Sequence, residues 1–419
     1  MTARMSQTHK RRKPQALRRA LLGTVASAGV WAVGVAGMAP AAVAADVQSK
    51  QWYLDAMRAD EMWKVTTGEG ITVAVIDTGV NPSTPSLKGQ VLKGLDATET
   101  KGDETDDYTG HGTTMAELIA GTGRGGGLQG LAPGVKIIPM RISDTEYQNH
   151  KMVNGQDSAD AIRAAADSDA RIISMSFGSD YSYSDERAAV EYAESKGKLF
   201  FAGVGNNAES DNKKKYPAGY PQVIGVASAD RKGTVSDYSQ HGKDVDIASP
   251  GSDIPFWCNE NFKSYCDGDG GTSAATAIAS ASAALVWSMH PDWTANQVLR
   301  VLFDTASRDW KDDDRSTYLG HGLIRPGANI LHGEGKPGDP EMNPLTGEKT
   351  PALRGSSTPS APASASAPQG KPGAEPVAAA SAEESSGGGR LGWILGGVAV
   401  VVVLAGGAFA VFRRRRTSY

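Results

Sequence analysis

The chain has 419 residues and a formal net charge of −4. This charge balance gives no support for nucleic acid as a partner, because nucleic-acid-binding domains carry a strongly basic surface. The length leaves room for one large domain with additional segments, and changes in composition along the chain show where those segments lie.

The first 45 residues have the pattern of a secretory signal peptide. The basic segments His9–Lys13 and Arg18-Arg19 precede an apolar run from Ala20 to Ala39, and four small residues follow at 42–45. Charged, apolar and small-residue regions in this order are typical of a signal that is removed on export. We therefore predict that residues 1–45 are a signal peptide, and the paired arginines leave the twin-arginine route open as well as the general one.

Residues 46–68 are predicted to be a short N-terminal extension, and residues 69–332 a globular domain. Continuous apolar runs predict strands at Ile71–Ile76, Ile137–Ile142, Ile172–Met175, Leu199–Val204 and Val223–Ala227. A 3.6-residue period predicts helices at Gly112–Ile119, Ser158–Ala166, Ser184–Lys196, Thr272–Met289 and Thr294–Thr305. The alternation predicts an α/β fold with a mainly parallel sheet covered by helices on both faces, in which ligand sites collect at the carboxyl ends of the strands.

Beyond this domain the chain changes character twice. Residues 333–390 are rich in proline, alanine, serine and glycine, and we predict a disordered linker there because the segment has few large apolar side chains to bury. Residues 391–412 are uncharged and apolar, and they are long enough to cross the roughly 30 Å hydrocarbon core as one transmembrane helix. The alternative for residues 391–412 is a helix buried in a protein core. The basic tail at 413–419 favours a cytoplasmic end and an outward-facing domain.

Ser273 stands at the start of a predicted helix that is rich in small residues. It follows Gly270-Gly271-Thr272 and precedes Ala274-Ala275. At a helix N-terminus, the macrodipole and the unpaired N–H groups stabilise the negative charge that develops when a serine attacks a carbonyl. When this segment is considered by itself, the alternative is an ordinary helix cap beside a glycine turn.

Two further polar residues occupy positions that suit catalysis. Asp77 follows the first predicted strand, and His111 precedes the helix predicted at Gly112–Ile119. Each has a simple alternative, a turn-forming aspartate and a solvated histidine. The chain order Asp, His, Ser is nevertheless one of the orders in which a catalytic triad is assembled. The sequence therefore predicts a triad of Asp77, His111 and Ser273.

The chain resembles the subtilisin-like serine proteases. The resemblance is carried by Asp77-Thr78-Gly79, His111-Gly112-Thr113 and Gly271-Thr272-Ser273-Ala274, and it extends over roughly residues 51–331. It implies that residues 69–332 are a peptidase domain that hydrolyses peptide bonds through an acyl-enzyme and uses no cofactor. Ser273 would be the nucleophile, His111 the general base and acid, and Asp77 the group that orients the imidazole.

The same resemblance implies an oxyanion hole and a substrate-binding segment. Asn206 matches the family's oxyanion-hole asparagine, with the adjacent Asn207 or a simple turn as alternatives. Ser174, Ser176 and Gly178 match the strand that pairs with an extended substrate, and Gly203 belongs to the opposite wall of the first side-chain pocket. The small residues of that wall predict an open pocket. Core packing is the alternative for Met175 and Phe177 of the first segment.

Within the family, the chain is most similar to the mycosins. Gln51–Asp55, Gly110–Ala120 and the linker followed by a membrane anchor carry this likeness. It implies a protease held at the cell membrane by one helix, with its catalytic domain outside and an association with type VII secretion. A structural component of the secretion complex, or a general degradative surface protease, are the alternatives.

The chain has only two cysteines, Cys258 and Cys266, and both follow the predicted signal. An even pair in an exported chain predicts a disulfide, and zinc is disfavoured because no second Cys/His pair lies at ligand spacing. The acidic residues Asp103, Glu104, Asp106 and Asp107 are predicted to form a solvated loop, with calcium as the alternative. No metal site is predicted.

Overall fold

The computed structural model describes residues 44–98, 100–142, 155–268, 270–310 and 314–350. Residues 1–43 of the predicted signal peptide, the linker beyond residue 350, the predicted transmembrane segment at 391–412 and the tail at 413–419 lie outside this part of the chain. Among the described residues, none of the helices has both the length and the apolar character needed to cross a membrane.

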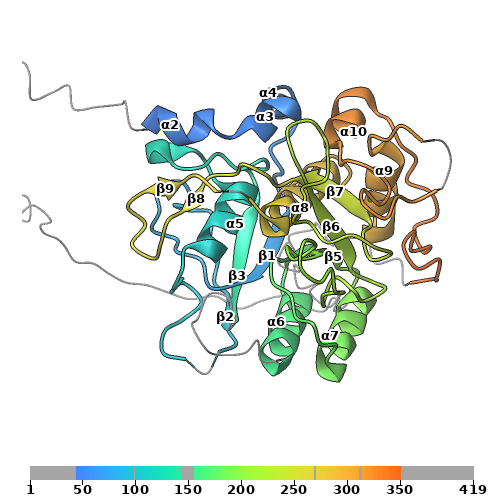
Figure 1. Cartoon of the computed structure of the whole chain (residues 1–419), viewed down its shortest axis with the longest axis horizontal. Coiled ribbons are helices and arrows are strands. Elements are labelled where there is room, and N and C mark those ends of the chain that lie inside the picture. Colours follow the sequence, from blue (N-terminus) through green and yellow to red (C-terminus); the bar gives the residue numbers. More distant parts are fainter. Residues whose placement is uncertain (1–43, 99, 143–154, 269, 311–313, 351–419) are drawn as a thin grey trace, which may run out of the picture. The chain divides into compact units, whose positions relative to one another are not determined.

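A seven-stranded sheet forms the centre of the domain (Figure 1). Its strands lie in the order β2-β3-β1-β4-β5-β6-β7, and every pairing is parallel. The bounds are β1 (Thr72–Asp77), β2 (Leu95–Asp96), β3 (Lys136–Arg141), β4 (Ile172–Met175), β5 (Leu199–Gly203), β6 (Ile224–Ala229) and β7 (Ile247–Pro250). The prediction of a mainly parallel sheet is confirmed, and the carboxyl ends of all seven strands meet at one edge.

Helices cover both faces of the sheet (Figure 1). One face packs against α5 (His111–Ala120), α8 (Thr272–Met289) and α9 (Ala295–Thr305), and the other against α6 (Gly155–Asp167) and α7 (Ser184–Ser195). Strand β1 shows why both faces need a cover. Val73 and Val75 belong to the first apolar cluster, whereas Ala74 and Ile76 belong to the second. A strand buried on both sides is continuously apolar, which is the pattern seen in the sequence.

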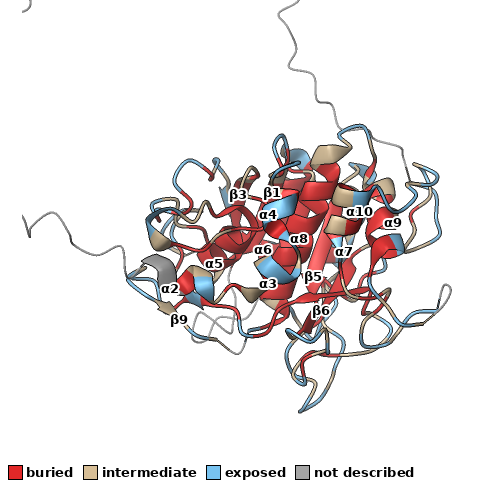
Figure 2. Cartoon of the chain, turned by 90° about the horizontal axis from the view of Figure 1, so that it is seen from above, coloured by how far each residue is buried: buried red, intermediate tan, exposed pale blue. Residues whose placement is uncertain are grey.

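Helix α8 passes through the centre of the larger layer, and Figure 2 shows it buried along most of its length. Every residue from Ala274 to Trp287 is buried. A helix that is buried all round must be apolar or small all round, and the alanines and serines of α8 meet this requirement while letting neighbouring elements approach closely.

The N-terminal extension packs on the domain through three short helices, α2 (Ala44–Ser49), α3 (Trp52–Ala56) and α4 (Ala59–Met62). Tyr53 and Met62 are fully buried in the larger apolar cluster. The Gln51 side chain pairs with the backbone of Gln129, donating from Nε2 at 2.7 Å and accepting at Oε1 at 2.8 Å. The extension is therefore part of the folded domain. The remaining elements are the 3-10 turn η1 (Arg124–Gly126), the hairpin β8 (Phe256–Trp257) and β9 (Tyr265–Cys266), and α10 (Pro326–His332).

The predicted linker begins too early in the sequence. Residues 333–350 pack against the domain, where Asn296 donates to the Thr350 hydroxyl at 2.8 Å and Asn343 donates to the Glu194 carboxylate at 2.8 Å. The linker prediction is therefore wrong for this segment. The polar composition of this segment did not indicate that it packs on the domain, because side-chain hydrogen bonds hold it there.

We predict that a chain ending after His332 is less stable than one ending after Thr350. The shorter chain loses the two hydrogen bonds of Asn296 and Asn343, each contributing about 1 kcal/mol. For a domain of this size, a loss of 1 kcal/mol lowers Tm by about 2–4 °C. Thermal unfolding of the two chains, both starting at residue 44, measures the difference. Equal melting temperatures would show that residues 333–350 contribute nothing to the fold.

Candidate active site

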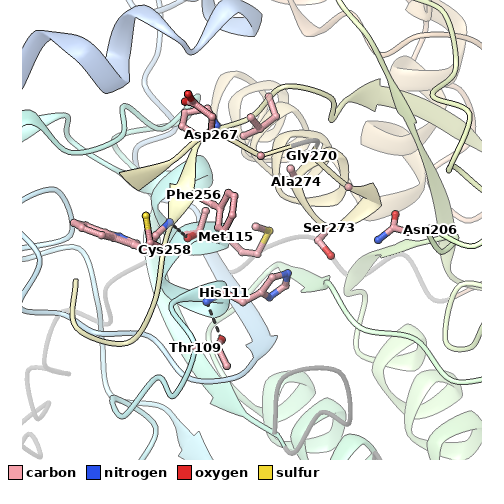
Figure 3. A pocket seen from close by; sticks show the side chains of 16 residues that line it. Thr109, His111, Met115, Asn206, Phe256, Cys258, Asp267, Gly270, Ser273 and Ala274 are labelled. Atoms are coloured by element: carbon pink, nitrogen blue, oxygen red, sulfur yellow. Dashed lines mark hydrogen bonds between the residues drawn. The ribbon is translucent and has the colours of Figure 1, made fainter. Parts of the chain in front are cut away.

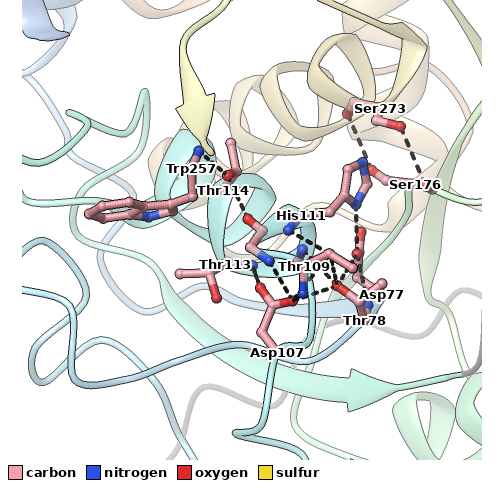
Figure 4. A network of polar contacts seen from close by, with 12 residues as sticks. Asp77, Thr78, Asp107, Thr109, His111, Thr113, Thr114, Ser176, Trp257 and Ser273 are labelled. Atoms are coloured by element: carbon pink, nitrogen blue, oxygen red, sulfur yellow. Dashed lines mark hydrogen bonds and ion pairs between the residues drawn. The ribbon is translucent and has the colours of Figure 1, made fainter. Parts of the chain in front are cut away.

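Asp77 and His111 meet at the carboxyl edge of the sheet. Asp77 is the last residue of β1, and His111 is the first residue of α5. The His111 Nδ1 and Asp77 Oδ1 atoms lie 2.7 Å apart (Figure 4), and the two side chains are only 13% and 2% exposed. With the Nδ1 proton donated to the carboxylate, Nε2 is the ring atom that can accept a proton from a substrate or a nucleophile.

The position of His111 depends on a second carboxylate, that of Asp107. Its Oδ1 accepts the amides of Thr109 and Gly110 at 3.1 and 3.0 Å, and its Oδ2 accepts the amide of Thr113 at 2.8 Å (Figure 4). Its Oδ1 also accepts the hydroxyl of Thr78, the neighbour of Asp77, at 2.8 Å. Asp107 therefore caps the helix that begins at His111 and also holds the strand end that carries Asp77.

Asp107 was predicted to belong to a solvated acidic loop, and this prediction is wrong for it because its side chain is buried. The rest of the loop encloses the fully buried guanidinium of Arg141. Arg141 donates to the Asp96 carboxylate at 3.2 Å and to the carbonyl of Asp103 at 2.8 Å, and it lies 4.0 Å from the Tyr108 ring centroid. Within the described residues, no three metal-ligating side chains gather into a cluster.

Ser273 is the second residue of α8, and Figure 3 shows the His111 imidazole pointing toward it. Its Oγ lies 3.4 Å from the Ser176 carbonyl oxygen, which is a weak contact. The backbone N–H of Ser273 belongs to the first turn of the helix, where amides have no acceptor within the helix. This N–H is therefore suited to bind an oxyanion.

Asn206 lies beside Ser273, and its amide group has a defined orientation. Its Oδ1 accepts the backbone N–H of Thr272 at 2.9 Å and the Thr272 hydroxyl at 3.0 Å. With the oxygen held in this way, the Nδ2 group turns toward the space next to Ser273 (Figure 3). A Cβ placed on Gly271 would lie 3.4 Å from Asn206 Nδ2 and 3.8 Å from the Ser273 backbone nitrogen, so both nitrogens border the same small space.

The predicted substrate-binding residues lie in different environments. Ser174 lies in β4, between β1 and β5, and is only 1% exposed. Its side chain is therefore buried and does not reach the site. Ser176 follows the end of β4, and its hydroxyl donates to the Ser273 carbonyl at 3.2 Å. Gly203 is the last residue of β5 and packs against Thr272, which leaves no room for a side chain. Gly178 is exposed.

Lys215 occupies the gap between the two predicted walls of the first pocket. A Cβ placed on Gly178 would lie 3.3 Å from the Lys215 Cβ, and one placed on Gly205 would lie 2.9 Å from its Cγ. Its Nζ forms an ion pair with Asp180. The side chain of Lys215 therefore borders both predicted walls. No pattern in the sequence singled out this residue, because a run of three lysines usually marks a solvated surface.

Glu117 is a further buried carboxyl beneath the site, on the inner side of α5. It is 0% exposed and accepts hydrogen bonds from the Thr84 hydroxyl at 2.8 Å and the Tyr265 hydroxyl at 2.6 Å. Burial raises the pKa of Glu117 to about 7. Tyr265 belongs to the hairpin β8–β9, which is cross-linked by a disulfide between Cys258 and Cys266. Glu117 thus links the helix of His111 to this hairpin.

Comparisons with known proteins agree with the fold. The chain matches the subtilase family over residues 68–322. Thermitase of Thermoactinomyces vulgaris is 33% identical over 66% of this chain and 94% of its own length. The thermophilic serine proteinase of Bacillus sp. (strain AK1) is 37% identical over 54% of this chain and 55% of its own length.

Solved structures give a similar result. MycP1 with its N-terminal propeptide removed is 28% identical with a TM-score of 0.56, covering 67% of this chain and 96% of that structure. MycP3 protease from the type VII (ESX-3) secretion system is 29% identical with a TM-score of 0.56, covering 66% of this chain and 87% of that structure. The fold is that of a subtilisin-like protein. The chain belongs to the subtilase family, and the resemblance to mycosins noted in its sequence is confirmed.

We predict that Asp107→Ala lowers both stability and activity. The substitution leaves buried amides at the start of α5 without an acceptor, which costs about 1–3 kcal/mol, and it releases His111 from its position. Urea unfolding measures the first effect, and kcat for peptide hydrolysis measures the second. Asp106→Ala is the matched control, because the Asp106 side chain is exposed. Equal effects of the two substitutions would contradict the capping role.

A second prediction concerns pH. The folded pKa of Glu117, about 7, lies above its ordinary value of 4.5, so the folded state holds this proton more tightly than the unfolded state. The contribution of Glu117 to stability is therefore greatest below pH 4.5, falls as the pH rises toward about 7, and is constant above that.

Glu117→Gln should remove this part of the pH dependence. We expect the fall in Tm between pH 5 and pH 8 to be smaller in the variant than in the unmodified chain, and thermal unfolding at the two pH values measures it. Glu209→Gln, at an exposed glutamate, should leave the fall unchanged. A fall of the same size in Glu117→Gln would show that Glu117 does not titrate in this range.

Proposed function

We propose that the chain is a serine endopeptidase in which Ser273, His111 and Asp77 act as a triad. His111 Nε2 removes the proton of the Ser273 hydroxyl as the oxygen attacks the scissile carbonyl, and it returns that proton to the leaving amine. Asp77 orients the ring through Nδ1 and stabilises the imidazolium. The observation that carries this proposal is the 2.7 Å contact between Asp77 and a histidine that points at a helix N-terminal serine.

The oxyanion formed by this attack is stabilised by the two donors beside Ser273. These are the Asn206 Nδ2 group, held by Thr272, and the Ser273 backbone N–H. The product of the first step is an acyl-enzyme that water then hydrolyses with the help of His111. Nucleophile, base and oxyanion donors all come from the chain, and we propose that the reaction uses no cofactor and no metal.

The proposed location is the outer side of the cell membrane. The signal-like segment at 1–45 would export the chain, and the apolar segment at 391–412 followed by Arg413–Arg416 would anchor it with the domain outside. The disulfide between Cys258 and Cys266 supports this location, because such bonds persist in oxidising compartments.

An association with type VII secretion follows from the structural neighbours. MycP3 is a protease from the type VII (ESX-3) secretion system, and MycP1 is an essential component of the type VII (ESX-1) secretion system. The role of MycP1 as a component favours a second candidate function, in which this chain is part of such an assembly and cleavage is secondary. A host strain that carries only Ser273→Ala separates the two functions, since secretion persists in that strain only if the structural role suffices. A general degradative protease would show no dependence of secretion on the chain.

Active-site labelling tests the proposed chemistry. The purified full chain is treated with a fluorophosphonate, beside Ser273→Ala and a heat-unfolded sample of the unmodified chain. We expect labelling of the folded unmodified chain alone, because only an activated serine reacts rapidly. Absent labelling, or labelling that survives in Ser273→Ala, would contradict the triad.

We predict that Asn206→Ala lowers kcat for peptide hydrolysis by about 10²–10³-fold, the loss found when one such donor is removed from subtilisin. The adjacent Asn207→Ala is the matched control, since it is Asn206 that accepts the two hydrogen bonds from Thr272. Steady-state kinetics on one peptide substrate compares the three proteins. A large loss in Asn207→Ala and a small one in Asn206→Ala would overturn the assignment.

A further inference from the structure

A cavity of about 540 Å³ begins at the catalytic residues. Ser273, His111 and Asn206 lie at one end of it, and Figure 3 shows it extending past Met115 toward Phe256 and Cys258, away from Asn206. This volume is within the range of about 300–1,000 Å³ that is usual for ligand sites in proteins.

The chemistry of the triad indicates which part of a peptide substrate would lie in this cavity. The scissile carbonyl oxygen binds between Asn206 and the Ser273 amide, and the leaving amine must lie next to His111 in order to receive its proton. The cavity wall includes His111, Thr114 and Met115 of α5, whereas Ser176 and Gly178 do not line it. The cavity therefore lies on the leaving-group side of the scissile bond.

The walls of the cavity are more apolar than polar. Their large apolar residues are Met115 from α5 and Ile254, Phe256 and Trp257 from the hairpin region, and Ala274 from α8 also lines the cavity. Phe256 is 39% exposed and lines the cavity. The carboxylate of Asp267 also lines the cavity, and it already forms an ion pair of 2.8 Å with Lys50 from the N-terminal extension.

This wall is held rigidly to the helix that carries His111. The Trp257 backbone N–H donates to the Thr114 hydroxyl at 3.0 Å, and the Trp257 ring stacks on Tyr265 with centroids 3.8 Å apart. Tyr265 in turn donates to the buried Glu117 of the same helix, and the disulfide closes the hairpin between Cys258 and Cys266. The pocket is thus already formed before a substrate binds.

We propose that this cavity receives the side chain of the residue that follows the scissile bond, and that it selects substrates with a large apolar residue there. The inference rests on the proposed peptidase function. A bulky aliphatic or aromatic side chain would bury apolar surface against Met115, Phe256 and Trp257. A small side chain would leave this space to water, and an acidic one would meet the carboxylate of Asp267.

Acyl transfer tests the leaving-group side alone. The full chain is acylated with a peptide ester, and an amino acid amide then competes with water for the acyl-enzyme. In this step, the amine nitrogen forms a bond with the acyl carbon while the bond from that carbon to Ser273 Oγ breaks. His111 moves the proton of the amine to Ser273 Oγ, so atoms and charge balance.

We expect phenylalaninamide and leucinamide to capture the acyl-enzyme at least about tenfold better than glycinamide, a ratio typical of a hydrophobic pocket. Phe256→Ala should reduce this ratio several-fold. Tyr318→Ala, which removes an exposed aromatic ring outside the cavity, should leave the ratio unchanged.

The outcomes separate the two proposals. Fluorophosphonate labelling of Ser273 with equal capture of all three amides would overturn the leaving-side preference and leave the peptidase function standing. A ratio that Phe256→Ala does not alter would also overturn it. Absence of both labelling and ester cleavage would contradict the proposed function itself, and this inference with it.

Discussion

Three neighbouring strands, β1, β4 and β5, run in the same direction, so the segments that follow them must emerge at the same edge of the sheet. Asp77 ends the first of these strands, Ser176 follows the second, and Asn206 follows the third after a short turn. The site therefore exists because the sheet is parallel. Any pairing that reversed one of these strands would move its functional residue to the opposite edge.

The same edge also receives the N-termini of two helices, and each N-terminus is fixed by a side chain from elsewhere in the chain. Asp107 holds the first turn of α5 and so places His111. Asn206 holds the Thr272 amide at the start of α8 and so places Ser273, while its other amide atom remains available for an oxyanion. In both cases a helix cap, which elsewhere contributes only stability, also determines the geometry of the catalytic groups.

The sequence predicted most of the layered core, because strands that are buried on both faces are continuously apolar and α8 is small-residue-rich along its whole length. It did not predict β7, a four-residue strand that ends in proline, or the packing of residues 333–350 through polar side chains. Residues matched to short motifs, such as Asp77 and His111, were found to lie together. Asp107, Lys215 and Glu117 were missed, because whether a charged side chain is buried depends on distant segments that cover it, and no local pattern reports them.

The central claim is that Ser273 attacks a carbonyl whose oxygen is received by Asn206 and the Ser273 amide. A crystal structure of the chain after reaction with a peptidyl phosphonate tests it most directly, since the phosphonyl oxygen stands in for the oxyanion. The account predicts a covalent bond to Ser273 Oγ and a phosphonyl oxygen within hydrogen-bond distance of Asn206 Nδ2 and the Ser273 N–H. An adduct on another residue, or an oxygen directed away from both donors, would contradict it.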